Sequence, residues 1–305
     1  MSSETATPSA PNTVQRFASV RSVIEQAIRQ HVFPGAAWGV LHRGTIAALD
    51  ATGRFTYEAD APVVQPQTIF DLASVTKVVA TTSAAMLLVD RGILDLDSRV
   101  GDILPGFVIG MEPGSGKQNV TLRMLLAHTS GLPAYATLFR EHSAPGALLR
   151  AILRLPLEAK PGVRTEYSDF GFILLGKAIE ILSREPLDIF CAGEIFAPLR
   201  LETTRFCPPQ KTRPEIPPTE DDSTFRHRII DRVADLPRGL GAHDFGLKDL
   251  FAAAAFVGRQ PDLHLCTIAV ETVHPMCTTL TPAVAAAVPG TVSWVRHLAM
   301  GLTRE

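Results

Sequence analysis

The alternation of apolar and polar residues predicts a helix followed by a β-hairpin near the start of the chain. Apolar residues recur at helical spacing over 14–32, which is typical of a surface helix. Two short apolar runs follow, 36–41 and 45–51, and Gly44 before the second supplies the positive φ that a hairpin turn favours. A two-stranded hairpin is marginal by itself, so further strands are expected to extend or cover it.

Further along, the pattern predicts mostly helices over 68–201, with loops at the Pro-Gly pairs. A proline-rich stretch over 207–222 predicts an irregular connection. Beyond it, the apolar spacing predicts a helix over 245–256 and strands over 263–270 and 291–295. The chain thus mixes helices with a small number of short strands.

Composition narrows the class of protein without naming an activity. The 305 residues, 46% of them hydrophobic, are enough for about two domains. A net charge of −2 offers no basic surface for nucleic acid or an anionic membrane, and no stretch has the roughly 18 clean apolar residues of a membrane span.

Residues 1–12, rich in Ser, Thr, Pro and Ala, predict a disordered tail without the pattern of a signal peptide. A cytoplasmic location is expected, or a periplasmic one if translation starts further upstream.

The four cysteines show no C-x-x-C spacing and no accompanying histidine pattern. They therefore predict neither a disulfide framework nor a zinc site. We expect no metal and no cofactor. The oligomeric state is left open by the sequence.

The sharpest local feature is Ser74-x-x-Lys77, at the start of a helix predicted over 70–89 and ended by Gly92. Residues 78–89 are all apolar or small, so this helix is expected to be buried on all sides. Residues three apart share a helix face. The pattern thus places a hydroxyl beside an amine in a buried setting.

This pair has a chemical meaning, because a serine is a poor nucleophile until an adjacent base takes its proton. The first turn of a helix also presents unpaired N–H groups and a dipole that stabilise negative charge. Under the alternative, Ser74 caps the helix and the Lys77 side chain reaches the surface.

A second feature, Tyr167-Ser168-Asp169, precedes an apolar helix predicted over 170–182. Ser168 or Asp169 suits the N-cap position, with Tyr167 packed against the helix as a staple. The alternative makes the Tyr167 phenol a proton-transfer partner of the serine–lysine pair.

Two other candidates are expected to be structural. The run 114–117 (GSGK) lacks the first glycine and the following Ser or Thr of a phosphate-binding loop. His128 lies at the end of a helix predicted from about Thr121, where an imidazole complements the helix dipole.

Taken in order, Ser74-x-x-Lys77, the run 122–133 (LRMLLAHTSGLP) and Tyr167-Ser168-Asp169 resemble the serine β-lactamase-related family. This family includes class C β-lactamases, penicillin-binding-protein-like peptidases and esterase relatives. The resemblance extends over roughly 20–230 and implies an α+β, β-lactamase/transpeptidase-like fold: a helical subdomain plus an antiparallel sheet flanked by helices. It divides the chain into a tail (1–12), a hydrolase domain (13–230) and a segment that departs from the family pattern (231–305), leaving the sheet incomplete at the C-terminal end.

The resemblance also implies roles for single residues. Ser74 corresponds to the acylated nucleophile, Lys77 to its proton acceptor, and Tyr167 to the general base that passes a proton to the leaving group. Asp169 stands where many relatives have Asn and is the candidate substrate-binding residue. A carboxylate there would favour charged Lys77 and weaken it as a base.

The third motif of the family, Lys/His-Thr/Ser-Gly on a strand lining the site, does not occur in the sequence. The run 211–213 (KTR) is the nearest approach and lacks the glycine. In the family that strand supplies a second oxyanion donor, and removing one such donor costs about 10²–10³ in kcat. The ordered motifs and the resemblance that they carry imply a serine hydrolase that acts through an acyl-enzyme on a small-molecule ester, amide or β-lactam. The alternative is a non-catalytic relative: a truncated or frame-altered chain, or a pseudo-enzyme that keeps a binding cleft.

Overall fold

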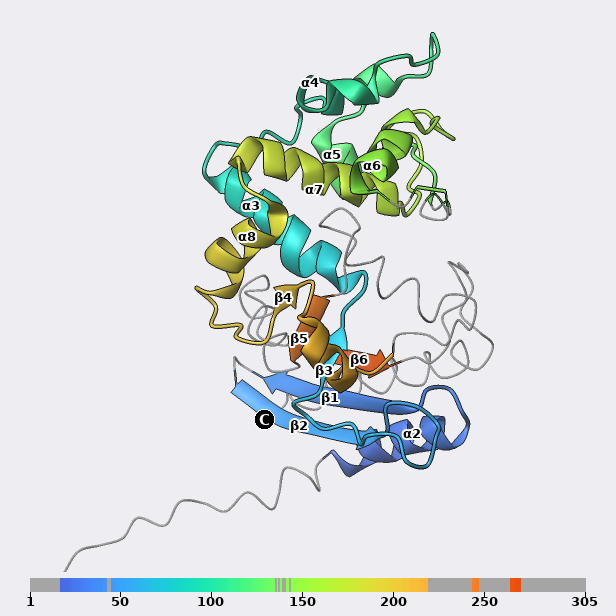
Figure 1. The fold of residues 1–305 in the computed structure, drawn as a ribbon, viewed down its shortest axis with the longest axis vertical. Helices are drawn as coiled ribbons and strands as arrows, with labels where there is room; N and C mark the ends of the chain where they lie inside the picture. Colours follow the sequence, from blue (N-terminus) through green and yellow to red (C-terminus); the bar gives the residue numbers. More distant parts are fainter. Residues whose placement is uncertain are drawn as a thin grey trace, which may run out of the picture.

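A computed structural model shows an α+β protein in which helices gather at one end and a β-hairpin forms the other (Figure 1). The short strands lie between these two parts. The structure describes residues 17–42, 45–134, 136, 138, 141–142, 144–218, 243–246 and 264–269. The tail predicted over 1–12, the strand predicted over 291–295 and most of segment 231–305 lie outside these ranges.

The predicted hairpin is confirmed. Strand β1 (Gly35–His42) pairs antiparallel with β2 (Thr45–Gly53), with a register shift between Val40 and Leu41. On its other edge β1 pairs antiparallel with β6 (His264–Ala269). The order β2-β1-β6 confirms both the strand predicted over 263–270 and the expectation that a further strand extends the hairpin.

Helix α2 (Ala18–Arg29) covers the hairpin and confirms the first predicted helix. Trp38 and Ala36 on β1 pack in a small core beneath this helix, where the ring centroids of Phe17 and Trp38 are 6.3 Å apart. The intervening residue Ala37 belongs instead to the main core. Successive β1 side chains therefore face opposite sides, as the pleat of a strand requires, and both sides are buried.

A second sheet has the order β3-β5-β4, all antiparallel: β3 is Ile69–Asp71, β5 is His243–Gly246 and β4 is Arg205–Phe206. Two predictions were wrong here. The helix predicted over 70–89 is preceded by β3, a strand too short to produce a visible alternation. The helix predicted over 245–256 begins within β5, and its remainder lies outside the described residues.

Along the sequence, helices occupy most of the stretch between β3 and β4. The longest helix of the described residues is α7 (Asp169–Ser183), which matches the helix predicted over 170–182. The other α and π elements are η1 (Lys77–Thr82), α3 (Ser83–Asp90), α4 (Val100–Ile103), α5 (Leu122–Leu126), α6 (Pro145–Arg154), α8 (Leu187–Cys191) and η5 (Ala192–Phe196). Short 3-10 turns are η2 (Pro105–Phe107), η3 (Lys117–Asn119) and η6 (Gln210–Glu215).

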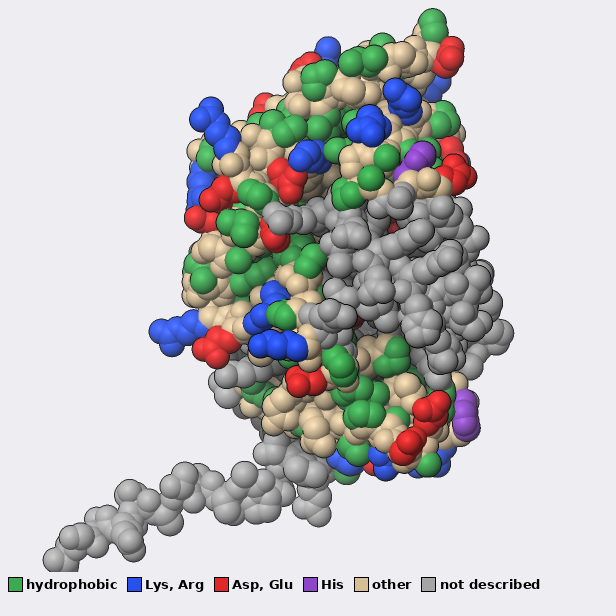
Figure 2. All heavy atoms as spheres, viewed as in Figure 1, with side chains coloured by type: hydrophobic (Ala, Val, Ile, Leu, Met, Phe, Trp, Pro, Cys, Tyr) green, Lys and Arg blue, Asp and Glu red, His purple; other side chains and the backbone are tan. Residues whose placement is uncertain are grey.

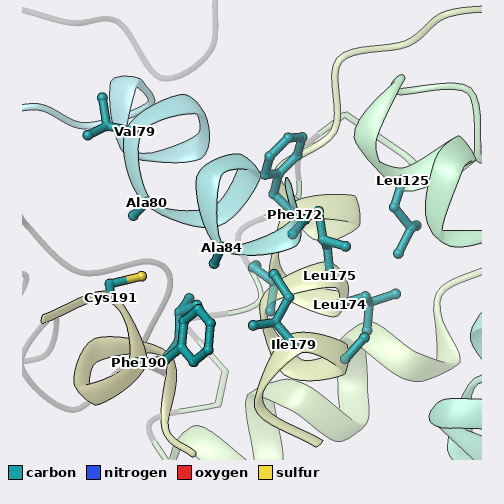
Figure 3. Close-up of a cluster of buried hydrophobic side chains, with 14 of the residues drawn as sticks. Val79, Ala80, Ala84, Leu125, Phe172, Leu174, Leu175, Ile179, Phe190 and Cys191 are labelled. Atoms are coloured by element: carbon teal, nitrogen blue, oxygen red, sulfur yellow. The ribbon is translucent and has the colours of Figure 1, made fainter. Parts of the chain in front are cut away.

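The main core is built around α7, whose residues Leu174, Leu175 and Ile179 are fully buried. Figure 3 shows Ile179 beside Ala84 of α3 and Phe190 of α8, and Leu174 on the side of α7 nearer to Leu125. Burial of this kind stabilises by about 25 cal/mol per Å² of apolar surface removed from water. The core therefore fixes η1 and α3 against α7, and with them the two segments that carry Lys77 and Asp169.

The expectation that the helix over 78–89 is buried on all sides was wrong. Val78 is 53% exposed, Met86 51% and Val89 39%, whereas Ala80, Ala84 and Leu88 on the same segment are buried. Apolar side chains accordingly reach the surface in the region of α3 and α8 (Figure 2). The apolar run thus gave no information about which face would remain in contact with solvent.

Candidate active site

Ser74 lies in the turn between β3 and the helix that contains η1. The residue before it, Ala73, has φ +43°, a left-handed conformation that is uncommon for a residue with a side chain. The Ala73 N–H donates to Asp71 Oδ1 at 2.8 Å, which stabilises this turn. Ser74 accepts a hydrogen bond from the Lys77 N–H at 3.1 Å, while its own N–H donates to no backbone carbonyl among the described residues. A left-handed residue therefore presents Ser74 at the start of a helix.

Lys77 lies one turn further on, and its side chain reaches back to the serine. Nζ donates to Ser74 Oγ at 3.0 Å, which confirms that the two residues share a face. The same Nζ lies 2.6 Å from Asp169 Oδ1, and the two side chains are only 15% and 19% exposed. The lysine ammonium is thus paired with a carboxylate in a largely buried position, and it does not extend to the surface.

Tyr167 contacts Ser74 from the loop that precedes α7. Its hydroxyl donates to Ser74 Oγ at 2.7 Å. Lys77 Nζ lies 5.0 Å from the centre of its ring. The Tyr167 hydroxyl and the Lys77 ammonium therefore meet at one serine oxygen.

Asp169 is held in place by the N-terminus of α7. Ser168 is the N-cap residue of this helix, as predicted: its Oγ accepts from the Gly171 N–H at 3.3 Å and donates to the Pro133 carbonyl at 2.7 Å. Asp169 then occupies the first turn, where a carboxylate is favoured by the helix dipole. Its carboxylate is paired with the Lys77 ammonium. If Asp169 contacts a substrate, it does so as a member of this ion pair.

The loop 128–134 lies directly beside the loop that carries Tyr167. The Glu158 N–H donates to the Gly131 carbonyl at 2.8 Å, and the Gly162 N–H donates to the Thr129 carbonyl at 2.8 Å. Gly131 has φ +79°, and a Cβ added there would lie 2.1 Å from the Ala159 carbonyl oxygen. Only glycine permits this close approach, which sets the distance between the two loops.

His128 follows α5 and packs against the site. The ring centroids of His128 and Tyr167 are 4.6 Å apart. Burial lowers the pKa of His128, the charge of Lys77 lowers it further, and Asp169 acts in the opposite direction. The imidazole is therefore favoured in its neutral form next to the tyrosine.

Two other lysine-containing runs, 114–117 and 211–213, lack the features of a catalytic motif. Lys117 of the run 114–117 is buried: Nζ donates to the Leu153 carbonyl at 2.8 Å and lies 4.5 Å from the centre of the Phe107 ring. Burial lowers the pKa of Lys117. The run 211–213 lies in η6, a 3-10 helix, and so lacks the strand geometry of the third family motif.

The described ranges hold no cluster of three or more His, Cys, Asp or Glu side chains arranged to bind a metal ion. None of the helices within those ranges is long and apolar enough to span a membrane. What the arrangement does offer chemically is a serine hydroxyl at a helix start, flanked by a phenol and by an ammonium–carboxylate pair.

Comparison with known proteins identifies the family of the chain. The sequence model of the family described as Beta-lactamase matches residues 20–254. Over 215 residues the chain is 34% identical to the N-acetylmuramyl-L-alanine amidase of Bacillus subtilis (strain 168), an alignment that covers 65% of this chain and 48% of the amidase. The chain thus spans about half the length of this curated relative.

Solved structures support the fold. EstCE1, a hydrolase with promiscuous acyltransferase activity, superposes with a TM-score of 0.66 at 23% identity, covering 80% of this chain and 73% of EstCE1. The class C β-lactamase from Rhodobacter sphaeroides gives a TM-score of 0.60 at 23% identity, covering 89% of this chain and 69% of that enzyme. The chain has the α+β fold of these structures and belongs to the Beta-lactamase family, the serine β-lactamase-related and penicillin-binding-protein-like proteins.

Proposed function

We propose that this chain is a serine hydrolase that forms an acyl-enzyme on Ser74. The observation that carries the proposal is the meeting of two side chains at one oxygen: Tyr167 Oη at 2.7 Å and Lys77 Nζ at 3.0 Å from Ser74 Oγ. A serine becomes a useful nucleophile when such groups remove its proton and orient it. Family membership supports the same reaction class.

In the proposed first step, Ser74 Oγ attacks the carbonyl carbon of the substrate and its proton moves to a base. An ammonium has three donors and no acceptor, and Lys77 is engaged as an ammonium with Asp169. Tyr167 is then the group that accepts the proton, as a phenolate whose own hydroxyl proton has first been released to water. It returns this proton to the leaving alcohol or amine when the tetrahedral intermediate collapses to the acyl-enzyme.

In the proposed second step, water replaces the leaving group. Tyr167 takes a proton from the water, the water oxygen attacks the acyl carbon, and the proton returns to Ser74 Oγ as the acid is released. Lys77 Nζ lies 5.0 Å from the centre of the Tyr167 ring and 3.0 Å from Ser74 Oγ, so its positive charge faces both groups between which the proton moves. The Ser74 N–H, at the start of the helix, is the first donor for the oxyanion.

The substrate class is a small ester, amide or β-lactam. The names of the relatives include an amidase, a hydrolase with acyltransferase activity and a class C β-lactamase, all of which act on acyl groups. The sequence supplies no third motif and hence no assigned second oxyanion donor. Because one such donor contributes about 10²–10³ to kcat, we expect slow turnover.

Hydrolysis assays test the proposal. A chromogenic acetate ester, an anilide and a chromogenic cephalosporin are each incubated with the native chain and with Ser74→Ala. We expect hydrolysis of at least one of them by the native chain and none above background by the variant. Ser83→Ala is the matched control, because the Ser83 hydroxyl donates to the Val78 carbonyl on the same helical segment and takes no part in the site. Equal activity of Ser74→Ala and the native chain would overturn the proposal, and no turnover of any substrate would favour the non-catalytic alternative.

A further inference from the structure

His128 holds Tyr167 by three separate contacts. Its carbonyl accepts the Glu166 N–H at 2.8 Å, on one side of the tyrosine. Its Nδ1 accepts the Ser168 N–H at 3.1 Å, on the other side. Its ring packs on the Tyr167 ring, with the centroids 4.6 Å apart. The residues before and after Tyr167, and Tyr167 itself, are therefore all attached to one histidine.

The hydrogen bond to Ser168 defines the tautomer of the imidazole. Because Nδ1 accepts a proton from the Ser168 amide, it carries none itself, and in the neutral ring the proton is on Nε2. Protonation of the ring would place an N–H on Nδ1, opposite the Ser168 N–H. Two donors would then face each other, so the protonated ring cannot keep this contact.

The conformation of His128 explains how one residue makes all three contacts. Its φ is +56°, in the left-handed region, which turns the chain back after α5 and points both its carbonyl and its ring toward the Tyr167 loop. Asn is one of the few other residues that adopt this conformation readily. Its side-chain Oδ1 also occupies nearly the same place as Nδ1 and accepts hydrogen bonds.

The charged groups around the ring come from two elements. Lys77 on η1 and Asp169 at the start of α7 act on His128 with opposite sign, and burial adds to the effect of Lys77. Tyr167 stacks on the ring, as Phe172 does with centroids 5.0 Å apart. The carboxylate of Glu166 lies 3.6 Å from Arg164 and is partly neutralised by it. In sum, the surroundings favour the neutral ring.

We propose that His128 is a positioning residue, whose neutral Nε2–H form holds the Tyr167 hydroxyl against Ser74 and whose protonation releases it. The inference rests on the proposed function for its effect on activity. It assigns to His128 the acid limb of Ser74 acylation, which is the fall in the acylation rate as the pH is lowered. His128 itself touches neither Ser74 nor the reacting carbonyl in this scheme. It acts through Tyr167.

The first test is the pH dependence of covalent labelling of Ser74 by a fluorophosphonate probe, with the second-order rate constant followed by intact mass. For the native chain we expect this rate constant to fall by about tenfold per pH unit once the ring is protonated, below the ordinary histidine pKa of 6.5. In His128→Asn the acceptor is kept and cannot be protonated, so the part of the acid loss that comes from His128 is expected to disappear and the acid limb to change.

His128→Gly removes the side chain without straining the left-handed backbone. Because misplacement of a catalytic group by about 1 Å can cost roughly 10²-fold, we expect labelling of this variant to be slowed by about that factor at neutral pH. His128→Asn is expected to stay within about tenfold of the native rate. An unchanged acid limb in His128→Asn, or native labelling rates in His128→Gly, would overturn the proposal.

A second readout separates this proposal from the proposed function. Long-range ¹H–¹⁵N spectra report which ring nitrogen carries the proton, and the Ser168 amide proton reports the hydrogen bond. We expect protonated Nε2, bare Nδ1, and loss of the hydrogen-bonded Ser168 signal when His128 titrates. If the native chain fails to label at all, the proposed function fails, and these spectra still decide whether His128 holds the loop. A proton on Nδ1 at neutral pH, or a Ser168 amide unaffected by the titration, would contradict it.

Discussion

The Tyr167 hydroxyl donates a 2.7 Å hydrogen bond to Ser74 Oγ, joining residues 93 positions apart in the chain. Neither residue is fixed by the other. Ser74 is placed by the turn after β3, and Tyr167 by the loop that precedes α7. The contact therefore depends on the packing of η1 against α7 in the main core.

Removing the Tyr167 hydroxyl tests its proposed role as the base. Tyr167→Phe keeps the ring that packs on His128 but cannot accept a proton. General acid–base catalysis contributes about 10²–10⁴-fold, so we expect ester hydrolysis and Ser74 labelling to slow by that factor, with an unchanged urea midpoint. Tyr57→Phe is the matched control, because it removes a tyrosine hydroxyl outside the site, from a ring that stacks on His31. An active Tyr167→Phe would exclude the phenolate as the base.

The Lys77–Asp169 pair is predicted to contribute to stability. Its side chains are 15% and 19% exposed, and Asp169→Asn would leave the lysine charge without its carboxylate in a largely buried position. Because the amide oxygen can still accept a hydrogen bond, we expect a loss of about 1–3 kcal/mol, less than for removal of a fully buried partner. Urea unfolding measures it.

Asp97→Asn is the control for that measurement, because Asp97 pairs with Arg123 on the surface, with side chains 67% and 56% exposed. Surface pairs contribute little, so the urea midpoint of this variant is expected to stay unchanged. If Asp169→Asn were as stable as the native chain, the buried ion pair would have no role in fixing Lys77.

Gly131 is predicted to be irreplaceable in the loop beside the site. In Gly131→Ala the new Cβ meets the Ala159 carbonyl at 2.1 Å, and its φ of +79° is unfavourable for alanine. We expect a loss of at least about 2 kcal/mol in urea unfolding. Gly92→Ala shares a positive φ but has nothing within 4 Å, so its loss is expected to be near 1 kcal/mol. Equal losses in the two variants would mean that the loops are free to move apart.

His128 is also predicted to make stability depend on pH. Its pKa in the folded chain lies below the ordinary value of 6.5, so the unfolded chain binds this proton first as the pH falls. The contribution is therefore fully present above pH 6.5 and is lost as the pH falls from 6.5 toward the folded pKa. Comparing urea midpoints above and below pH 6.5, we expect a smaller acid loss in His128→Asn than in the native chain. Equal losses would assign the effect to other histidines.

Much of this arrangement was predictable because it is local. The spacing of Ser74 and Lys77 places them on one face of a helix, Ser168 caps a helix from its own sequence context, and Gly92 ends one. The partnership of Tyr167 with Ser74 is different, since nothing in the local pattern brings the two segments together. It came from the resemblance, which carries information about tertiary packing that periodicity lacks.

The failures have physical reasons as well. Strand β3 is three residues long, too short for alternation to be recognised, so the apolar pattern assigns it to the helix that follows. The exposure of Val78 and Met86 depends on which neighbours pack against α3, which an apolar run cannot specify. His128 was interpreted as the complement of a helix dipole. Its contacts with the residues on both sides of Tyr167 depend on its left-handed backbone conformation. The identity of a single residue does not predict that conformation.

Formation of an acyl-enzyme on Ser74 can be measured with a fluorophosphonate probe followed by intact mass and peptide mapping. We expect a single adduct on Ser74 of the native chain and none on Ser74→Ala under the same conditions. A native chain that takes up no label, or a Ser74→Ala variant that labels equally well, would contradict it.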